Sequence, residues 1–328
     1  MKIGFIGAGV IAKAHIGCMQ RSVPEAEIVG VSDIDGQRAA QVADEFGITA
    51  FENNAALLEA GVDAVFVCTY PKAHKLCVIE ALDAGKHVFC EKPLAPTYEE
   101  GREIARAVRR TDRKFMVGYL FHFSSAARRI KVLLDSGDLG DLALAWSVRC
   151  SYFLPPADTW LADPVGGGIL DVCTHDIEFL SWLGGRPVSV TASGLTAHAA
   201  LKCVDTTSVT MRFKKGIGSV LASWASPLTV VHVGVAGTRG TGTLVQDGAR
   251  FRLTLKLHGQ AETSEAGGDL AGVMVAEQQH FIDAIRNDRP VAVGLPEALL
   301  ALQIHEAIQT SWTTGQPVPV ESRSETAE

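Results

Sequence analysis

The stretch KIGFIGAGVIAKAHI, residues 2–16, decides the fold. A run typical of a buried strand leads directly into Gly7, Gly9 and Ala12, and a helical pattern follows. In such a G-x-G-x-x-A turn the first glycine permits a tight bend, and the second lets the backbone approach a pyrophosphate. The third small residue allows the helix to pack closely on the strand, and the helix N-terminus faces the anion. We therefore expect a dinucleotide-binding loop here.

An acidic residue ends the next strand-like run, in IVGVSDID. Asp33 lies 26 residues after Gly7, close to the spacing of roughly 20 residues expected for the group that binds the ribose. A carboxylate there would accept from the ribose hydroxyls and repel a 2′-phosphate, which favours NAD; the nearby Arg38 leaves NADP open. The alternative is a chance turn with Asp33 as a helix N-cap, but Asp35 is better placed to cap a helix that opens at Gly36.

Up to about residue 118, short apolar runs alternate with helical patterns. This alternation is typical of a parallel sheet covered by helices on both faces. We expect strands at Lys2–Ile6, Glu27–Ser32, Ala64–Thr69, His87–Cys90 and Lys114–Gly118. We expect helices at Ala12–Arg21, Gln37–Phe46, Ala73–Ala84 and Tyr98–Arg110.

Beyond this point, strand-like runs are joined by turns rich in Gly, Lys and Asp, which indicates a largely antiparallel sheet. The expected strands include Ala143–Phe153, Val188–Ser193, Thr206–Phe213, Ser219–Trp224 and Thr229–Val235. Helices are expected at Ala126–Asp135, Ala276–Asn287 and Glu297–Thr314.

Composition excludes several classes of partner. The 328 residues are 47% hydrophobic and 20% charged, with a formal net charge of −7 and no basic stripe, so no nucleic acid or anionic membrane partner is expected. Seven scattered cysteines without a C-x-x-C pair favour reduced thiols in a cytoplasmic protein and disfavour structural zinc. No apolar stretch approaches the roughly 20 residues that span a bilayer. The apolar start, Met1–Ala12, is better explained by the glycine loop than by a signal peptide.

A second stretch, GKHVFCEKPLA at residues 85–95, ends an apolar run on Glu91, Lys92 and Pro93. It occurs in order with the glycine loop, CTYPKAH, MVGYLFHF, IKVLLDSGDLG and GGGILDVCTHDIEFLSWLGG. Over nearly its whole length the chain thereby resembles the glucose–fructose oxidoreductase / inositol dehydrogenase (Gfo/Idh/MocA) family. The resemblance implies an α/β fold in two domains. Residues 1–120 would form an N-terminal Rossmann doubly wound parallel sheet that binds NAD, and residues 121–328 a C-terminal α/β domain with a large open, mainly antiparallel sheet for substrate binding and oligomerisation.

Lys92 is placed where ligands of open α/β sheets bind, beyond the carboxyl end of a strand. A residue before proline is restricted to extended backbone, so Pro93 helps to aim the lysine. A cis Lys92–Pro93 bond would fit this role. The alternative is a lysine that only caps a surface loop.

Asp171 and His175, in GGGILDVCTH, are four residues apart and would share one helix face. The resemblance makes them catalytic together with Lys92. An imidazole, with an ordinary pKa of about 6.5, can take the hydroxyl proton while hydride passes to the nicotinamide. We assign His175 as general acid/base, Lys92 as stabiliser of the developing oxyanion, and Asp171 as the orienting group. Lys92 and His175 could exchange these roles.

Two other interpretations of this segment remain. Asp171, Cys173 and His175 could be metal ligands, but residues two apart do not share a helix face and no further ligand cluster appears, so we expect no metal. His175 could also be a hydrogen-bonded core histidine. The family commonly has Asp three residues beyond the histidine, where this chain has Glu178.

The resemblance also implies the remaining site residues. For the cofactor these are Gly7, Gly9, Val10, Ile11, Ala12, Asp33, Thr69, His74, Glu91 and Lys92. His74 would lie near the nicotinamide ribose, but Tyr70 stands where proline is usual, so His74 could equally be structural. The candidate substrate residues are Tyr119, His122, at a position often held by arginine, and Trp160, which could stack on a sugar.

The implied function is an NAD-dependent dehydrogenase or reductase acting on a monosaccharide, inositol or related polyol. One alternative is redox-neutral glycoside cleavage with transient reduction of NAD. Another is a non-enzymatic NAD-binding regulator, which need not keep Lys92, Asp171 and His175 together. An open sheet face needs covering, so with the resemblance we expect a homodimer or homotetramer.

Overall fold

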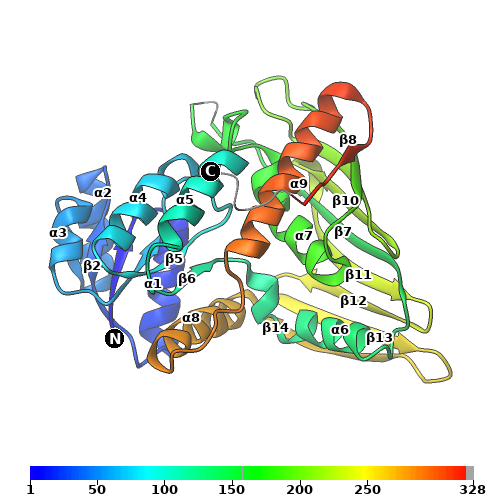
Figure 1. Ribbon diagram of the computed structural model, residues 1–328, viewed down its shortest axis with the longest axis horizontal. Coiled ribbons are helices and arrows are strands. Elements are labelled where there is room, and N and C mark those ends of the chain that lie inside the picture. The colour runs from blue at the N-terminus through cyan, green and yellow to red at the C-terminus, as the bar shows by residue number, and fades with distance from the viewer. Residues whose placement is uncertain (157, 323–328) are drawn as a thin grey trace. The chain divides into compact units, whose positions relative to one another are not determined.

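The computed structural model describes residues 1–156 and 158–322, which form two compact units. The first unit comprises Met1–Leu120 with Ala271–Leu299, and the second is the rest of the described chain. Each unit is built on its own sheet, six-stranded in the first and nine-stranded in the second (Figure 1). The expected fold class, one parallel and one mainly antiparallel sheet, is confirmed.

The first unit contains a parallel sheet with strand order β3-β2-β1-β4-β5-β6. Every residue of β4 is buried, as expected of a central strand covered on both faces. The strand order reverses between β1 and β4, which is where ligands of open α/β sheets bind. The strands are β1 (Lys2–Ile6), β2 (Glu27–Ser32), β3 (Thr49–Phe51), β4 (Ala64–Val67), β5 (His87–Cys90) and β6 (Phe115–Val117).

Five helices connect these strands: α1 (Val10–Ser22), α2 (Gly36–Phe46), α3 (Asn54–Glu59), α4 (Pro71–Asp83) and α5 (Tyr98–Val108). Asp35 caps α2 as predicted, since its side chain accepts from the backbone N–H groups of Gln37 and Arg38. The sequence did not indicate β3 or α3, because a strand of three residues and a helix of six are too short to give a periodic pattern.

Helix α8 (Leu270–Arg286) groups with the first unit, although the sequence assigned all of residues 121–328 to one domain. The ring of Phe281 lies 5.8 Å from that of Phe66 and 5.9 Å from that of Phe89, measured between centroids. The chain therefore returns to the first unit because α8 buries an apolar face on the parallel sheet. Substrate binding and oligomerisation by residues 121–328 stay predictions.

The second unit contains a sheet with strand order β14-β13-β12-β11-β7-β10-β9-β8-β15. Its strands are β7 (Leu142–Tyr152), β8 (Ser189–Leu195), β9 (Thr206–Arg212), β10 (Ile217–Ser223), β11 (Ala225–Gly237), β12 (Gly240–Asp247), β13 (Arg250–Leu257), β14 (Thr263–Asp269) and β15 (Val318–Pro319). Strands β7 and β10 run parallel, and the other paired neighbours run antiparallel. Side chains of β9 alternate between buried and more exposed positions, so one face of the sheet is covered.

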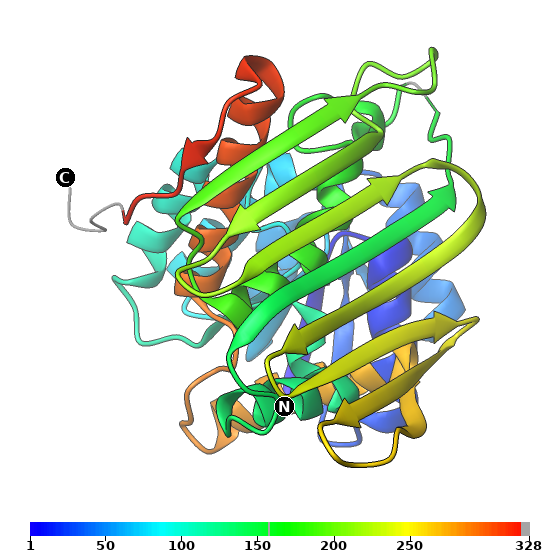
Figure 2. The same ribbon diagram turned by 90° about the vertical axis from the view of Figure 1, so that its right-hand side faces the viewer.

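The covering helices of this sheet include α7 (Ile169–Gly184), which packs on β7 and β10, and α6 (Ser125–Asp135), which packs on β12 and β14. The remaining helical segments are α9 (Leu295–Thr314) and the short η1 (Leu120–Phe123) and η2 (Trp160–Ala162). Figure 2 looks onto the opposite face of the sheet, where the strands lie in front of the helices. The sequence analysis named no strand at β12–β14; β12 and β14 contain few apolar residues and lack the alternating pattern that β13 shows. None of the helices in the described ranges is long and apolar enough to cross a membrane.

Candidate functional site

The turn between β1 and α1 has the geometry expected of the glycine loop. Gly7 adopts a φ of 99°, and a Cβ there would lie 2.7 Å from the backbone oxygen of Cys68. The N–H of Gly7 donates to the backbone oxygen of Ser32 at 2.7 Å, so the loop is held between the ends of β2 and β4. Both the positive φ and the close approach require glycine at this position.

The start of α1 fits the pyrophosphate of a dinucleotide. Gly9 is the N-cap of α1 without a side-chain cap, and a Cβ added to it would meet nothing within 4 Å. Val10 is 88% exposed and Ile11 is also exposed, whereas Ala12 is fully buried. Because uncapped N–H groups at a helix N-terminus bind anions, this turn could hold the pyrophosphate through its backbone.

Asp33 binds the glycine loop and does not cap α2. One carboxylate oxygen accepts from the N–H of Ala8 at 2.7 Å, and the other accepts from the N–H of Asp35 at 2.8 Å. Each oxygen keeps a second lone pair that could accept from a ribose hydroxyl. The guanidinium of Arg38 lies 3.5 Å from Asp33 and 3.3 Å from Asp35. A cation so close to Asp33 would soften the repulsion of a 2′-phosphate.

His74 is fully buried and connects the chain after β4 with the chain after β5. Its Nε2 lies 3.0 Å from the backbone oxygen of Thr69, and its Nδ1 lies 2.9 Å from that of Pro93. Burial lowers the pKa of His74, although both carbonyl oxygens favour the protonated ring. The geometry fits the structural role that the sequence left open. Cofactor contacts of Thr69 and His74 stay predictions.

Glu91 and Lys92 follow β5, at the carboxyl edge of the parallel sheet. Oε1 of the buried Glu91 lies 2.8 Å from Nε2 of His15, and Oε2 accepts from the backbone N–H of Lys92 at 3.1 Å. Burial opposes ionisation of Glu91, but the contact with His15 and the charge of Lys92 outweigh it and lower the pKa of Glu91. The Lys92–Pro93 peptide bond is cis, as the sequence indicated.

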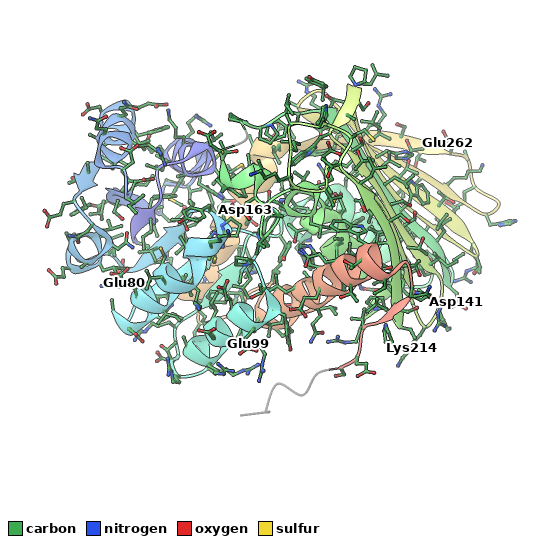
Figure 3. All side chains as sticks on the ribbon, turned by 90° about the horizontal axis from the view of Figure 1, so that it is seen from above. Glu80, Glu99, Asp141, Asp163, Lys214 and Glu262 are labelled. Atoms are coloured by element: carbon green, nitrogen blue, oxygen red, sulfur yellow. The ribbon has the colours of Figure 1, made fainter. Side chains whose placement is uncertain are left out.

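The other two expected catalytic side chains lie on α7. Asp171 is buried in its first turn, and the half-buried His175 follows one turn later on the same face. The glycine run before α7 is a turn in which backbone segments approach closely. A Cβ on Gly167 would lie 2.7 Å from the backbone oxygen of Asp163, which is labelled in Figure 3. Within the described ranges, no three His, Cys, Asp or Glu side chains are grouped as metal ligands would be.

An ion pair next to His175 fastens α7 to the sheet. Nε and Nη2 of Arg149 donate to the two carboxylate oxygens of Asp176 at 2.7 and 2.9 Å, and the hydroxyl of Ser147 donates at 2.8 Å. Asp176 is fully buried. Burial opposes the charged guanidinium, but the carboxylate of Asp176 outweighs it and raises the pKa of Arg149. The bidentate geometry fixes the orientation of the helix on the sheet.

The three candidate substrate residues have different surroundings. Tyr119 is fully buried in the first unit, and Trp160 is exposed on η2. His122 is buried in the second unit, with Nε2 2.7 Å from Oε1 of Glu178 and its ring stacked on Trp182 at 4.1 Å between centroids. The glutamate at position 178 therefore contacts this buried histidine. Substrate contacts of Tyr119, His122 and Trp160 stay predictions.

The sequence analysis missed the polar side chains behind Glu91. Nε2 of Gln278, on α8, lies 2.9 Å from both Nδ1 and the backbone oxygen of His15. The neighbouring Glu277 is buried, and burial together with the charge of Glu91 raises its pKa well above the ordinary value. One sequence feature could have revealed them: a polar residue on the buried face of a helix. His15 in α1 and Gln278 in α8 both have this feature.

Comparison with known families identifies the class of protein. Residues 1–119 match the family described as oxidoreductase family, NAD-binding Rossmann fold, and residues 127–243 match the GFO/IDH/MocA C-terminal domain. The chain therefore belongs to the Gfo/Idh/MocA family of oxidoreductases, and its first unit contains the family's NAD-binding Rossmann fold. The resemblance inferred from the sequence is confirmed.

Individual relatives are similar over different lengths. Inositol 2-dehydrogenase 3 of Saccharopolyspora erythraea is 36% identical over 56% of this chain and 53% of its own length. The scyllo-inositol 2-dehydrogenase (NAD(+)) of Bacillus subtilis is 28% identical over 98% of this chain and 96% of its own. The matched stretch thus spans about half the length of several curated relatives. A solved structure of levoglucosan dehydrogenase with NADH and levoglucosan has a TM-score of 0.89 at 21% identity, covering 98% and 99% of the two chains, which shows a shared fold.

Proposed function

We propose that this protein is an NAD-dependent oxidoreductase that transfers hydride between nicotinamide and a secondary alcohol or ketone of a sugar, inositol or related polyol. The observation that carries the proposal is a glycine loop with Asp33 bound to it, in a family of NAD-binding oxidoreductases. The printed names of the relatives, inositol dehydrogenases and a levoglucosan dehydrogenase, support the polyol class of substrate.

Lys92, Asp171 and His175 are the side chains that we assign to the chemistry. When bound, the nicotinamide supplies the hydride acceptor or donor. His175 takes the hydroxyl proton on its imidazole during oxidation and returns it during reduction, because an imidazole changes charge near neutral pH. The ammonium of Lys92 donates to the substrate oxygen and stabilises its developing negative charge, and these two residues could exchange roles. Asp171, one helical turn away, orients the imidazole.

Asp33 supports NAD as the cofactor in preference to NADP. Both of its oxygens are held by backbone N–H groups, so a fixed negative charge would face the ribose and oppose a 2′-phosphate. Arg38 lies 3.5 Å away and leaves some capacity for NADP.

We further propose a homodimer or homotetramer in which the open face of the nine-stranded sheet is covered. Leu144, Ile217, Leu221 and Val230 lie on this face, on the adjacent strands β7, β10 and β11, and are 38% to 47% exposed. A contiguous apolar patch of this kind is typical of a protein–protein interface. Sedimentation or light scattering would test the assembly.

A cytoplasmic location is also part of the proposal. All seven cysteines are free, and six of them are buried. Free thiols of this number are expected in a reducing compartment.

A screen of sugars and inositols with NAD and with NADP, followed by the absorbance of the reduced nicotinamide, tests the proposed function. We expect stoichiometric NADH from at least one polyol. In Lys92→Ala, kcat should fall by about 100-fold or more while NAD still binds, because the lysine acts on the substrate oxygen. Near-normal kcat in this variant would remove the assignment of Lys92.

Product analysis with glycosides and a measurement of NAD binding separate the alternatives. Cleavage of a glycoside without accumulation of NADH would indicate redox-neutral chemistry. Binding of NAD with no turnover of any compound would instead favour a regulator.

A further inference from the structure

Behind Lys92, the first unit contains a continuous chain of buried hydrogen bonds. Gln278 of α8 contacts Nδ1 of His15 on α1 at 2.9 Å, and Nε2 of His15 lies 2.8 Å from Oε1 of Glu91. The other oxygen of Glu91 accepts from the backbone N–H of Lys92 at 3.1 Å. Gln278 is 0%, His15 1% and Glu91 7% exposed, so water does not replace these partners.

Gln278 fixes the direction of these hydrogen bonds. Its Nε2 also lies 2.9 Å from the backbone oxygen of His15, so this atom is the amide nitrogen, with one hydrogen for each acceptor. Nδ1 of His15 is therefore an acceptor, and the ring proton is on Nε2, where it is donated to Glu91. The rings of Phe66 and Phe89, at 5.5 and 5.3 Å from the imidazole, hold it in this orientation.

Glu91 carries the negative charge of this buried cluster. The neighbouring Glu277 interacts with it electrostatically, and two adjacent buried carboxyls do not both ionise near neutral pH. Burial and then the charge of Glu91 raise the pKa of Glu277 and of the thiols of Cys68 and Cys90.

Two further groups interact with this charge. His74 is buried, which lowers its pKa, and the ammonium of Lys92 is the positive group next to Glu91. The cluster therefore pairs one carboxylate with one ammonium among neutral neighbours.

We propose that His15 and Gln278 are positioning residues for Lys92: they keep Glu91 ionised in one orientation, and Glu91 in turn fixes the peptide of Lys92 through its backbone N–H. This inference rests on the proposed role of Lys92 in the reaction. A hydrogen bond between a donor and an ionised acceptor is stronger than a neutral one, so Glu91 holds the lysine segment firmly. Without the donor on His15, Glu91 would be a buried carboxylate beside Glu277 and would take up a proton near neutral pH.

Two substitutions at position 15 separate the hydrogen bond from packing. His15→Leu removes the donor, whereas the amide of His15→Gln can still donate to Glu91. In His15→Leu we expect kcat to fall about 10-fold or more at pH 7, with KM little changed, because a hydrogen bond to a charged group is lost. The loss should diminish towards pH 9, where Glu91 ionises again. His15→Gln should keep most of kcat and the wild-type pH profile.

Helix α8 offers a second variant and a matched control. Gln278→Leu removes the amide that donates to Nδ1 of His15. This variant should reduce kcat in the same pH-dependent way as His15→Leu, but by less. Gln279, the next residue, donates to the backbone oxygen of Ser22 at 3.3 Å in an exposed position. Gln279→Leu should therefore leave kcat and its pH profile unchanged.

Thermal unfolding of the cofactor-free protein tests the inference without any turnover. In the wild type, the pKa of Glu91 is lowered on folding, so its contribution to stability is present in full above the unfolded pKa of a carboxyl and is lost only at lower pH. In His15→Leu the shift should reverse. The Tm difference between His15→Leu and His15→Gln, which both lack the titrating imidazole, should then widen from pH 4 to pH 8, which a simple packing defect would not produce.

The outcomes are distinct. A Tm difference that is constant with pH, or unchanged kcat in His15→Leu, would overturn the inference. If the wild type turns over no polyol, the proposed function fails, but the Tm comparison still decides whether His15 keeps Glu91 ionised.

Discussion

The two candidate catalytic segments are anchored by different chemistry. In the first unit, Lys92 follows Glu91, which is held by an imidazole and an amide. In the second unit, His175 precedes Asp176, which is held by a guanidinium and a hydroxyl of β7. In both, the anchor is the immediate chain neighbour of the candidate catalytic residue. Since successive side chains of a helix or an extended segment point in different directions, the neighbour can be fixed in the interior without occupying the reacting side chain.

The difference concerns the sensitivity of each anchor to protonation. Arg149 and Asp176 neutralise each other, and the pKa of Arg149 is raised despite its burial, so this pair stays charged at neutral pH. Glu91 is hydrogen-bonded to an imidazole and competes with Glu277 for a proton. The anchor of α7 should therefore be strong and independent of pH, whereas the anchor of Lys92 should respond to pH. The following experiments test that contrast.

The largest effect is expected from breaking the ion pair. Arg149→Met leaves the fully buried carboxylate of Asp176 with the hydroxyl of Ser147 but without a guanidinium. Removing one partner of a buried pair costs about 3–5 kcal/mol of unfolding free energy, because the remaining charge is uncompensated. Urea denaturation of the wild type and the variant at pH 7 would measure the loss.

The double variant Arg149→Met/Asp176→Leu is the control for this loss. It should recover much of the stability, since apolar residues often replace a buried ion pair at little cost. A loss below about 1 kcal/mol in the single variant would mean that the pair does not anchor α7.

The local parts of the site were predictable from the sequence, but the anchors were not. The glycine loop and the turn at Lys92 depend on residues that are adjacent in the chain, such as Gly7 and Pro93. The anchoring partners lie far apart: His15 and Glu91 are separated by 76 positions, and Gln278 and His15 by 263. A single sequence does not indicate which distant polar groups meet.

The same limit explains α8 and the pair on α7. The sequence showed that α8 has an apolar face. It did not show that this face covers the parallel sheet, which is built from the other end of the chain. Asp171 and His175 were found through the family resemblance. Asp176, adjacent to His175, appeared only as another polar residue of a helix, because its partner Arg149 lies on a strand 27 positions away.

Glu277→Gln should change how the stability of the protein depends on pH, because Glu277 lies beside the anchor Glu91. Burial and the charge of Glu91 raise the folded-state pKa of Glu277 above its unfolded value, so the wild type loses stability as the pH rises above the unfolded pKa. Glutamine does not ionise. The free energy of unfolding of the variant should therefore rise relative to that of the wild type by up to about 1.4 kcal/mol per pH unit in this window. Tm measurements from pH 4 to pH 9 should show no difference at the acid end and a growing one above it.

A surface carboxylate provides the matched control for Glu277. Glu262 is exposed near the end of a hairpin and is labelled in Figure 3. Glu262→Gln should give a Tm difference that does not change with pH. If Glu277→Gln behaves in the same way, Glu277 does not compete with Glu91 for a proton.

Asp33→Ser should have the smallest effect, because it alters the choice of cofactor. Unlike Glu91 and Asp176, Asp33 is at once an anchor and a candidate ligand group, since its oxygens accept from the loop at Ala8 and could also accept from the ribose. A serine removes the charge that opposes a 2′-phosphate and keeps a hydroxyl, while Arg38 remains nearby. The ratio of the dissociation constants of NADPH and NADH, measured by fluorescence, should fall about 10-fold, or about 1.4 kcal/mol.

The double variant Asp33→Ser/Arg38→Gln decides which residue produces this change. It should lose the gain in NADPH affinity, because no guanidinium then remains to bind the 2′-phosphate. If Asp33→Ser weakens both cofactors equally, the carboxylate serves only to hold the glycine loop. Asp33 would then be an anchor of the same kind as Glu91 and Asp176, and the preference for NAD would have to come from another part of the first unit.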